Sequence, residues 1–366
     1  MTPEDFATES SLTASLGEDG AYGEDRPPRK TGRRYWLHIA LLLATMFTTS
    51  LVGSRMQQNF QANLPPLGVE ELWDAFVHGW RQPLALLDGL PFSLTLLTIL
   101  LAHEFGHFLT CVHYGLDASL PYFLPAPVLT GTFGAFIRIR SPIYYKRTLF
   151  DVAVGGPLAG FVFLLPALAI GLAYSKVIPG IANEGAFRYG VPALLWLLEK
   201  LVFPGVASSD IYLHPVARAA WIGLLATAWN LLPIGQLDGG HVVYSLAGRW
   251  HKMLTWIFLA GLVVLGIRFW HGWLVWAVLL YFLGRRHPAI VDPGSIGSGR
   301  KKLAWLTLLI FVLCFTPAPL VENPESERAE EGFRMVGQAV SLAILDSCGA
   351  TGRRNRLPHH PKSFFP

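Results

Sequence analysis

The sequence predicts an all-α polytopic membrane protein with about six to seven transmembrane helices and a small β-strand or hairpin element. Three observations predict this class. Of the 366 residues, 52% are hydrophobic and only 15% are charged, whereas soluble domains carry about 25% charged residues. The mean hydropathy is +0.40. The chain also contains 12 Trp, a residue that favours the membrane–water interface. A soluble enzyme, a disordered interaction protein and a disulfide-stapled secreted domain are therefore poor fits.

Residues 1–34 are polar, acidic at first and basic at the end, and we expect them to be disordered. The apolar run that follows has no small-residue cleavage site before it, so it is expected to be a retained span rather than a signal peptide. Residues 35–316 form the predicted membrane domain, with a catalytic core at about 90–245. Residues 317–366 are rich in Pro and charge and are expected to form a weakly ordered tail.

Apolar runs of about 20 residues, the length that crosses a bilayer as a helix, recur along this domain. The clearest are Tyr35–Gly53, Phe92–Cys111, Phe150–Tyr174 and Val216–Leu232. Three shorter runs are Met253–Ile267, Phe269–Leu283 and Leu303–Phe315. Arg268 separates the first two of these, which predicts a tight helical hairpin. Val191–Phe203 is interrupted by Glu199 and Lys200, and is expected to lie at the membrane interface.

Small residues and charges along these runs bear on packing and orientation. Gly156 and Gly160 form a GxxxG pattern, which permits close contact between helices, and Cys111 is expected to be a small packing residue. Lys and Arg are concentrated in alternate connections, which predicts a cytoplasmic N-terminus. This distribution explains the isoelectric point near 9.0 through membrane topology, so a nucleic-acid partner is not expected.

The second apolar run contains the segment His-Glu-Phe-Gly-His, from His103 through Glu104 to His107. Residues four apart on a helix are rotated by about 40°, so the two imidazoles share a face and can bind one metal ion. Glu104 can reach a water at that metal without being a ligand. These polar groups would cost several kcal/mol in an apolar helix unless they were paired or bound to metal. The sequence therefore predicts a metal site here.

A third ligand is expected because a catalytic zinc site has three protein ligands and one open position. The fourth clear run ends in Asn-Leu-Leu-Pro-Ile-Gly-Gln-Leu-Asp-Gly-Gly-His. Pro233 and the neighbouring glycines would break a helix at membrane depth, which is tolerated where backbone lines a polar cavity. Asp238 is the predicted third ligand, and His241 is a possible supporting residue or alternative ligand.

The segment HEFGH on an apolar helix, followed by NLLPIGQLDGGH, resembles the site-2 protease family of intramembrane zinc metalloproteases. Three further segments, Leu120–Pro127, Gly131–Arg140 and Phe150–Phe161, resemble the branch of the family found in bacteria and plastids. The resemblance extends from the second run to His241. The connections are too short for a PDZ domain.

The resemblance implies one Zn²⁺ held by His103, His107 and Asp238, with Glu104 as the general base. It implies hydrolysis of peptide bonds in or near the transmembrane segments of other membrane proteins. Asn230 occupies the Asn position of the family's segment, where it would hydrogen-bond substrate or intermediate, with interhelical packing as the alternative. The expected partners are transmembrane protein substrates and the lipid bilayer, and an unknown regulatory subunit remains open. The expected location is the bacterial plasma (inner) membrane, with the site toward the cytoplasm.

Residues 131–140 alternate in a period of two, which predicts a strand. The family is similar in placing a small sheet near its site, where an unwound substrate could add as a strand. Gly131, Phe133 and Gly134 are therefore candidate substrate-contacting residues. The alternative is a hairpin at the membrane surface, anchored by its arginines.

The alternative function is a metal-binding membrane protein, either a transporter or a non-proteolytic chaperone. An intact Glu104 argues against the chaperone, because metal binding alone does not need a base. Few ionisable residues lie on the other apolar runs, which argues against transport.

Overall fold

The computed structural model describes residues 35–81, 83–185, 187–283 and 294–323. The chain divides into residues 1–37 and residues 38–366, and the architecture below is that of the second unit. Residues 1–34, expected to be disordered, and residues 324–366 of the expected tail lie outside the described residues. The domain limits at 34 and 316 therefore remain predictions.

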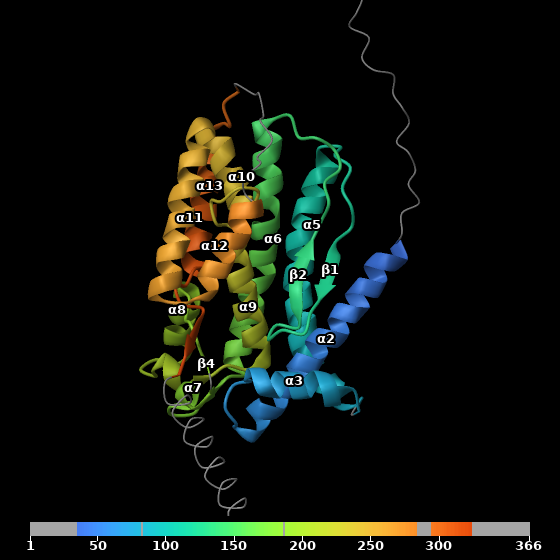
Figure 1. Ribbon diagram of the computed structural model, residues 1–366, viewed down its shortest axis with the longest axis vertical. Helices are drawn as coiled ribbons and strands as arrows, with labels where there is room; N and C mark the ends of the chain where they lie inside the picture. The colour runs from blue at the N-terminus through green and yellow to red at the C-terminus, as the bar shows by residue number, and fades with distance from the viewer. Residues whose placement is uncertain (1–34, 82, 186, 284–293, 324–366) are drawn as a thin grey trace, which may run out of the picture. The chain divides into compact units, whose positions relative to one another are not determined.

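The predicted apolar runs are all helical (Figure 1). The longer helices are α2 (Tyr35–Ala62), α5 (Leu90–His113), α6 (Lys146–Ala173), α9 (Pro215–Asn230), α11 (His251–Arg268), α12 (Gly272–Leu283) and α13 (Ser298–Cys314). The shorter ones are α3 (Val69–His78), α4 (Ala85–Asp88), α7 (Ile181–Glu184), α8 (Ala193–Val202) and α10 (Asp238–Ala247). Single 3₁₀ turns lie at Gly79–Arg81, Ser208–Asp210 and Gly248–Trp250. Helices α11 and α12 pack together, which confirms the predicted hairpin.

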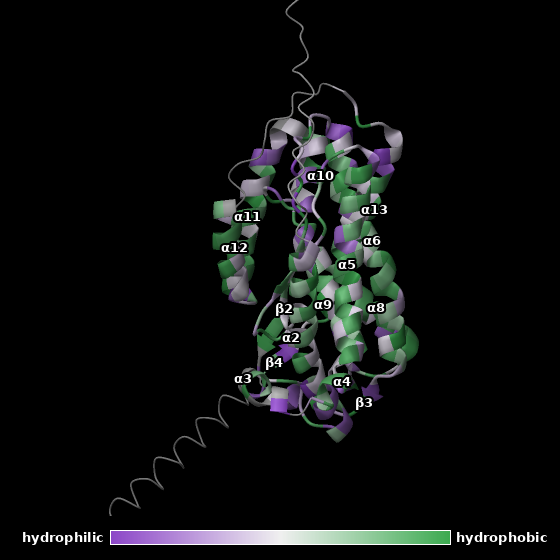
Figure 2. Cartoon of the chain, turned by 90° about the vertical axis from the view of Figure 1, so that its right-hand side faces the viewer, coloured by the Kyte–Doolittle hydropathy of each residue, from purple (hydrophilic) through white to green (hydrophobic). Residues whose placement is uncertain are grey.

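Four helices among the described residues are long and apolar enough to cross a membrane, namely α2, α5, α6 and α11. The helices are largely hydrophobic along their lengths (Figure 2), and a membrane location follows. Helices α9 and α13, with 16 and 17 residues, are shorter than the roughly 20 residues that a span needs. The expected six to seven spans therefore remain a prediction beyond these four.

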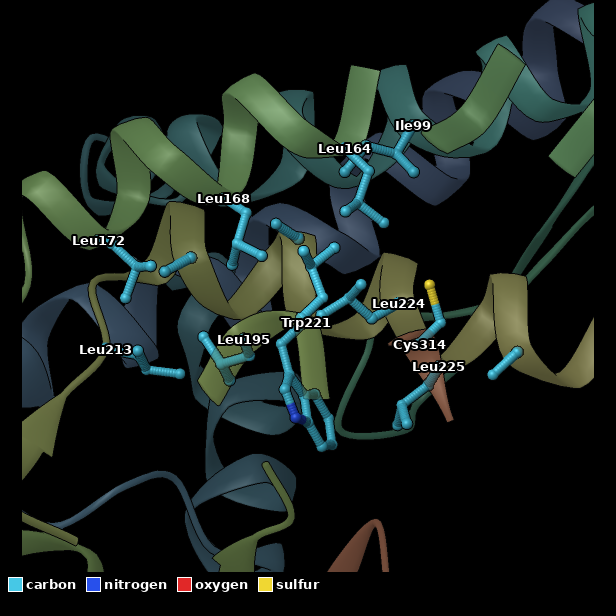
Figure 3. Packing of buried hydrophobic residues seen from close by; sticks show 14 of the residues in the cluster. Ile99, Leu164, Leu168, Leu172, Leu195, Leu213, Trp221, Leu224, Leu225 and Cys314 are labelled. Carbon is cyan, nitrogen blue, oxygen red and sulfur yellow. The ribbon is translucent and has the colours of Figure 1, made fainter. Parts of the chain in front are cut away.

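The core that supports the site is formed where α5, α6 and α9 pack against one another. Buried side chains fill this interface (Figure 3), among them Ile99, Leu164, Leu168, Leu172 and Leu224. Helix α10 packs on α6, and α13 contacts α6, α8 and α9. Because lipid tails are as apolar as Leu, close van der Waals packing at these contacts, rather than escape from water, stabilises the bundle.

Within the described ranges, three two-stranded antiparallel sheets accompany the helices. Strand β1 (Tyr122–Pro125) pairs with β2 (Thr132–Phe136), with an irregular register between Phe123 and Pro125. This is the predicted strand, but it ends at Phe136, and beyond it only Ile139 makes an isolated bridge, to Ala118. The other two pairs were not predicted: β3 (Lys176–Val177) with β5 (Ile211–Tyr212), and β4 (Phe187–Tyr189) with β6 (Leu320–Glu322).

Candidate metal centre

Helix α5 carries His103, Glu104 and His107 in its second half. Leu-rich turns precede them, Pro91 lies in the first turn, where its missing N–H is harmless, and Gly115 follows the helix with a left-handed φ of +67°. The three side chains face inward: His103, Glu104 and His107 are 6%, 7% and 8% exposed. The helix therefore brings two imidazoles and one carboxyl into the protein interior.

Asp238 reaches the same place because the chain turns back sharply after α9. Gly235 has a φ of +53°, a conformation that favours glycine. A Cβ on Gly239 would lie 2.0 Å from the carbonyl oxygen of Leu231, and one on Gly240 would lie 2.4 Å from that of Gly235. Only glycines allow this tight loop, at whose end α10 begins with Asp238.

The Nε2 atoms of His103 and His107 lie 3.3 and 3.2 Å from Oδ2 of Asp238. Among the described residues, these three form a group whose donor atoms all lie within 4.8 Å of one another. Two ligands at about 2.1 Å from a tetrahedral zinc ion are about 3.4 Å apart. The spacing and the donor set, two imidazoles and a carboxylate, therefore fit zinc.

Helix α6 fixes the orientation of the His107 ring. Nδ1 of His107 lies 2.7 Å from the carbonyl oxygen of Val152, so Nδ1–H donates there and Nε2 presents its lone pair to a metal. Gly156 lies against the other ring nitrogen, since a Cβ at this position would be 2.1 Å from Nε2. Cys111, one turn after His107, is fully buried among Ala118 and Val152, which fits the packing role expected of it.

Glu104 lies beside the group of three without belonging to it. The backbone of Ile137, one residue past β2, lies close to its carboxyl group, so the segment that follows the hairpin borders the site. Asn230, the last residue of α9, places Nδ2 3.4 Å from Nε2 of His103. His241 lies one turn after Asp238 and is not part of the described group.

The β1–β2 hairpin lies against α5 and against α2. Gly131 has a φ of +72°, and its carbonyl oxygen accepts a hydrogen bond of 2.7 Å from Thr48 Oγ1. A Cβ at this position would lie 2.6 Å from Cα of Thr49. Phe133 is 73% exposed, and Gly134, with a φ of +101°, has open space around its Cα. Gly131 is thus a docking point, whereas Phe133 and Gly134 face outward.

Sequence reasoning missed one cluster near the metal centre. Nε and Nη2 of Arg300, in α13, donate to the Asp151 carboxylate at 2.8 and 2.6 Å. The hydroxyl of Tyr114, which follows α5, also donates to that carboxylate. Asp151 directly precedes Val152, whose carbonyl orients His107. No local pattern connects Arg300 to a residue 149 positions earlier, so only the folded chain reveals this contact.

Residues 91–267 match the peptidase family M50. The chain is 33% identical over 300 residues to the probable chloroplastic zinc metalloprotease EGY1 of Arabidopsis thaliana, covering 78% of this chain and 53% of that protein. It is 35% identical over 208 residues to the probable chloroplastic zinc metalloprotease EGY2 of the same plant, covering 55% and 36%. EGY1 of Oryza sativa subsp. japonica is 30% identical over 300 residues, with 78% and 51% covered. The chain spans about half the length of the curated EGY1 relatives it matches.

Proposed function

The chain belongs to peptidase family M50, the site-2 protease family, through residues 91–267, and from that premise we propose that it is an intramembrane zinc metalloendopeptidase. Its substrates are peptide bonds in or near the transmembrane segments of other membrane proteins. The observation that carries the proposal is the group of His103, His107 and Asp238, with the Glu104 carboxyl beside it on a buried helix.

In this proposal one Zn²⁺ is held by the imidazoles of His103 and His107 and by the carboxylate of Asp238. Zinc bound there supplies a Lewis acid for the peptide carbonyl and lowers the pKa of a coordinated water toward about 7. Three protein ligands leave one position open, which is the arrangement of catalytic rather than structural zinc sites. The His107 Nδ1–H bond to Val152 supports the ligand role, because it fixes the tautomer whose Nε2 can bind metal.

Glu104 is the proposed general base. Its carboxylate accepts a proton from the attacking water and later donates that proton to the nitrogen of the leaving amine. The position next to His103 in the sequence supports this role, since it brings the carboxylate near the metal without making it a ligand. The backbone of Ile137, just past the hairpin, lies close to this carboxyl group, which places Glu104 on the side of the site that borders the hairpin.

Asn230 is proposed to donate a hydrogen bond from Nδ2 to the carbonyl oxygen of the substrate. Its distance of 3.4 Å from Nε2 of His103 supports this assignment, because the amide then lies within reach of a group bound at the metal. If Asn230 acts in packing alone, Asn230→Ala would change thermal stability and leave the cleavage rate of the folded protein unaltered.

The β1–β2 hairpin is proposed to bind substrate as an added strand. A peptide bond inside a helix is shielded by its own hydrogen bonds, so it must be extended before hydrolysis, and a strand edge can pair with an extended segment. Phe133, with its 73% exposed side chain, offers an apolar contact to a transmembrane segment. Gly134 allows close approach of the backbone, and Gly131 anchors the hairpin to α2.

The protein is proposed to be integral to a membrane. Its N-terminus and its metal centre are proposed to face the side of the membrane on which most of the Lys and Arg residues of the connections lie. The names of the relatives place them in chloroplasts, so the comparisons give no support to the bacterial plasma membrane that the sequence led us to expect. Transmembrane proteins are the proposed substrates.

The test is cleavage of a single-span substrate by the purified full chain in liposomes, with bound zinc measured in the same samples. Wild type is compared with Glu104→Gln and with Glu184→Gln, a control that removes an exposed carboxylate from α7. We expect equal zinc in all three proteins. Cleavage by Glu104→Gln should fall by about 10²- to 10⁴-fold, and Glu184→Gln should cleave as wild type does.

Three results would contradict parts of the proposal. Full activity of Glu104→Gln would remove Glu104 as the base. Absence of zinc from the wild type after preparation with excess metal would remove the ligand assignment. Zinc in every sample with no cleavage of any of a panel of single-span substrates would favour the metal-binding transporter or chaperone instead.

A further inference from the structure

A buried arginine lies at the end of α9 that is remote from the metal centre. Arg218 belongs to the first turns of the helix, and Asn230 is its last residue. Twelve residues at 1.5 Å per residue separate the two by about 18 Å along the helix axis. Arg218 is therefore too far from the metal ligands to contact them.

The guanidinium of Arg218 has no carboxylate partner and no hydrogen-bond acceptor among the residues that the structure describes. The residue is 8% exposed, and its Cζ lies 3.9 Å from the centre of the Tyr189 ring, in a cation–π contact. A buried charge that lacks a hydrogen-bonded partner is strongly unfavourable. The contact with the face of the Tyr189 ring leaves the five N–H groups of the guanidinium without a hydrogen-bond acceptor. These donors therefore favour an anion.

Arg218 lines an open cavity. Its lining includes Arg218, Tyr189, Leu195, Glu199, Tyr212 and Trp221. In Figure 3, Trp221 extends from α9 away from α6. The wall is thus mostly apolar and aromatic, with Arg218 as its cationic side chain.

Several other polar groups of the wall already have partners within the protein. Trp221 Nε1 donates to the carbonyl oxygen of Gly190 at 2.7 Å, and the Tyr212 hydroxyl donates to that of Leu64 at 2.7 Å. The Glu199 carboxyl accepts from Ser208 Oγ at 2.5 Å. Burial raises the pKa of Glu199. The N-terminal end of α9 adds the positive end of its helix dipole beside Arg218.

Helix α8 connects this cavity to an exposed apolar surface. Leu195 and Glu199, one turn apart, line the cavity. Leu197 and Leu201 lie on the opposite side of the same helix, with Trp196 on its flank, and the three side chains are 54%, 77% and 52% exposed. In a membrane protein such a helix face contacts lipid tails. A lipid beside α8 could therefore reach the cavity with its headgroup.

We propose that Arg218 and the cavity around it bind the phosphate group of a membrane lipid headgroup, with the acyl chains along the exposed face of α8. The guanidinium fork suits two phosphate oxygens at once, and the aromatic walls exclude water around the contact. This lipid site is separate from the proposed protease function, and either can hold without the other.

The test titrates dihexanoyl phosphatidylglycerol into the purified full chain in an uncharged detergent and counts bound lipid by native mass spectrometry. Inorganic phosphate is titrated separately. The variants are Arg218→Met, Arg218→Lys and the matched control Arg188→Met, which removes an exposed arginine from β4 next to Tyr189. Thermal melting of each variant reports whether it is folded.

We expect Arg218→Met to bind the lipid at least tenfold more weakly than wild type. Arg218→Lys should be intermediate, because it keeps the charge without the fork, and Arg188→Met should be unchanged. If Arg218→Met does not fold, Arg218→Lys carries the comparison. Equal lipid binding by wild type and the folded Arg218 variants overturns the site. Inorganic phosphate binding as tightly as the lipid overturns the lipid assignment, since the cavity would then bind free anions.

Discussion

Gly156→Ala is the substitution whose effect on the metal centre follows most directly from the geometry. The added Cβ would lie 2.1 Å from Nε2 of His107, the same nitrogen that lies 3.2 Å from Oδ2 of Asp238. Ordinary contacts of a Cβ begin near 3.4 Å, so the methyl group or the ring must move by more than about 1 Å. Zinc–ligand distances tolerate only about 0.2 Å. His107 would therefore no longer fit the metal position set by the other two ligands.

The expected loss of zinc affinity follows from the displacement of His107, one of the three proposed ligands. Changes that only tilt a ligand weaken metal binding by about 10- to 100-fold, so direct displacement should weaken zinc binding by at least about 100-fold. Forcing a methyl group into a packed helix contact also costs about 1–3 kcal/mol of folding free energy. Cleavage of a substrate should be lost in parallel with the zinc.

The assay measures the zinc bound by the full chain at a series of buffered free zinc concentrations, together with thermal melting. Gly261→Ala is the control, since a Cβ at that position in α11 meets no atom within 4 Å, and it should bind zinc as wild type does. Gly160→Ala should have a smaller effect than Gly156→Ala, because its Cβ would lie 3.2 Å from Cβ and 3.4 Å from Nδ1 of His103, which requires a much smaller displacement. Wild-type zinc affinity in folded Gly156→Ala would refute the reasoning.

Three further predictions concern the ligands and their supports. Asp238→Asn should weaken zinc binding by at least about tenfold; an unchanged zinc content after dialysis against a chelator would contradict the ligand role. Arg300→Met removes both donors to the Asp151 carboxylate at 2.6 and 2.8 Å and should lower the melting temperature by a few degrees. A change of less than about 1 °C would mean that the contact contributes little. Gly131→Ala forces a side chain into a φ of +72° and against Thr49, at about 1–3 kcal/mol. Cleavage by Gly131→Ala should slow while its zinc content stays unchanged. Loss of both cleavage and zinc would contradict the proposal that the hairpin acts on the substrate and not on the metal centre.

Much of the arrangement around α5 was predictable because it depends on local spacing. Two histidines four residues apart share a helix face whatever the tertiary fold is, and the structure places both Nε2 atoms toward one point. Asp238 was predictable for a different reason. Pro233 and the glycines after it predict broken helix, and at membrane depth such a break is tolerated only beside protein or a polar cavity. The catalytic and ligand roles of these residues remain proposals.

The strand prediction was correct in place but too long. Alternation over residues 131–140 predicts a continuous strand, yet β2 ends at Phe136. Alternation reports which side chains share a face, and it does not report whether a partner strand is present. Here β1 is only four residues long and its register is irregular before Pro125. The ladder therefore ends where the partner ends.

The two short strand pairs, β4 with β6 and β3 with β5, could not be predicted from local patterns. Strands β4 and β6 pair Phe187–Tyr189 with Leu320–Glu322, and β3 and β5 are only two residues each. Strands this short carry too few residues for a period of two to be visible. Their partners are far away in the sequence, and β6 lies in the segment expected to be a weakly ordered tail. Chain topology, rather than propensity, decides such pairs.

Helix α6 contributes no ligand, yet it determines how a ligand is presented. The sequence assigned Gly156 and Gly160 to helix packing, which a GxxxG pattern predicts. In the folded chain the carbonyl of Val152 accepts the Nδ1 proton of His107, and Gly156 leaves room for Nε2. The two residues lie one turn apart, so both nitrogens of the ring are set by a single helix face. The geometry of the metal site therefore depends on the packing of α5 against α6. A substitution that separates the two helices should reduce zinc affinity even when every ligand is intact.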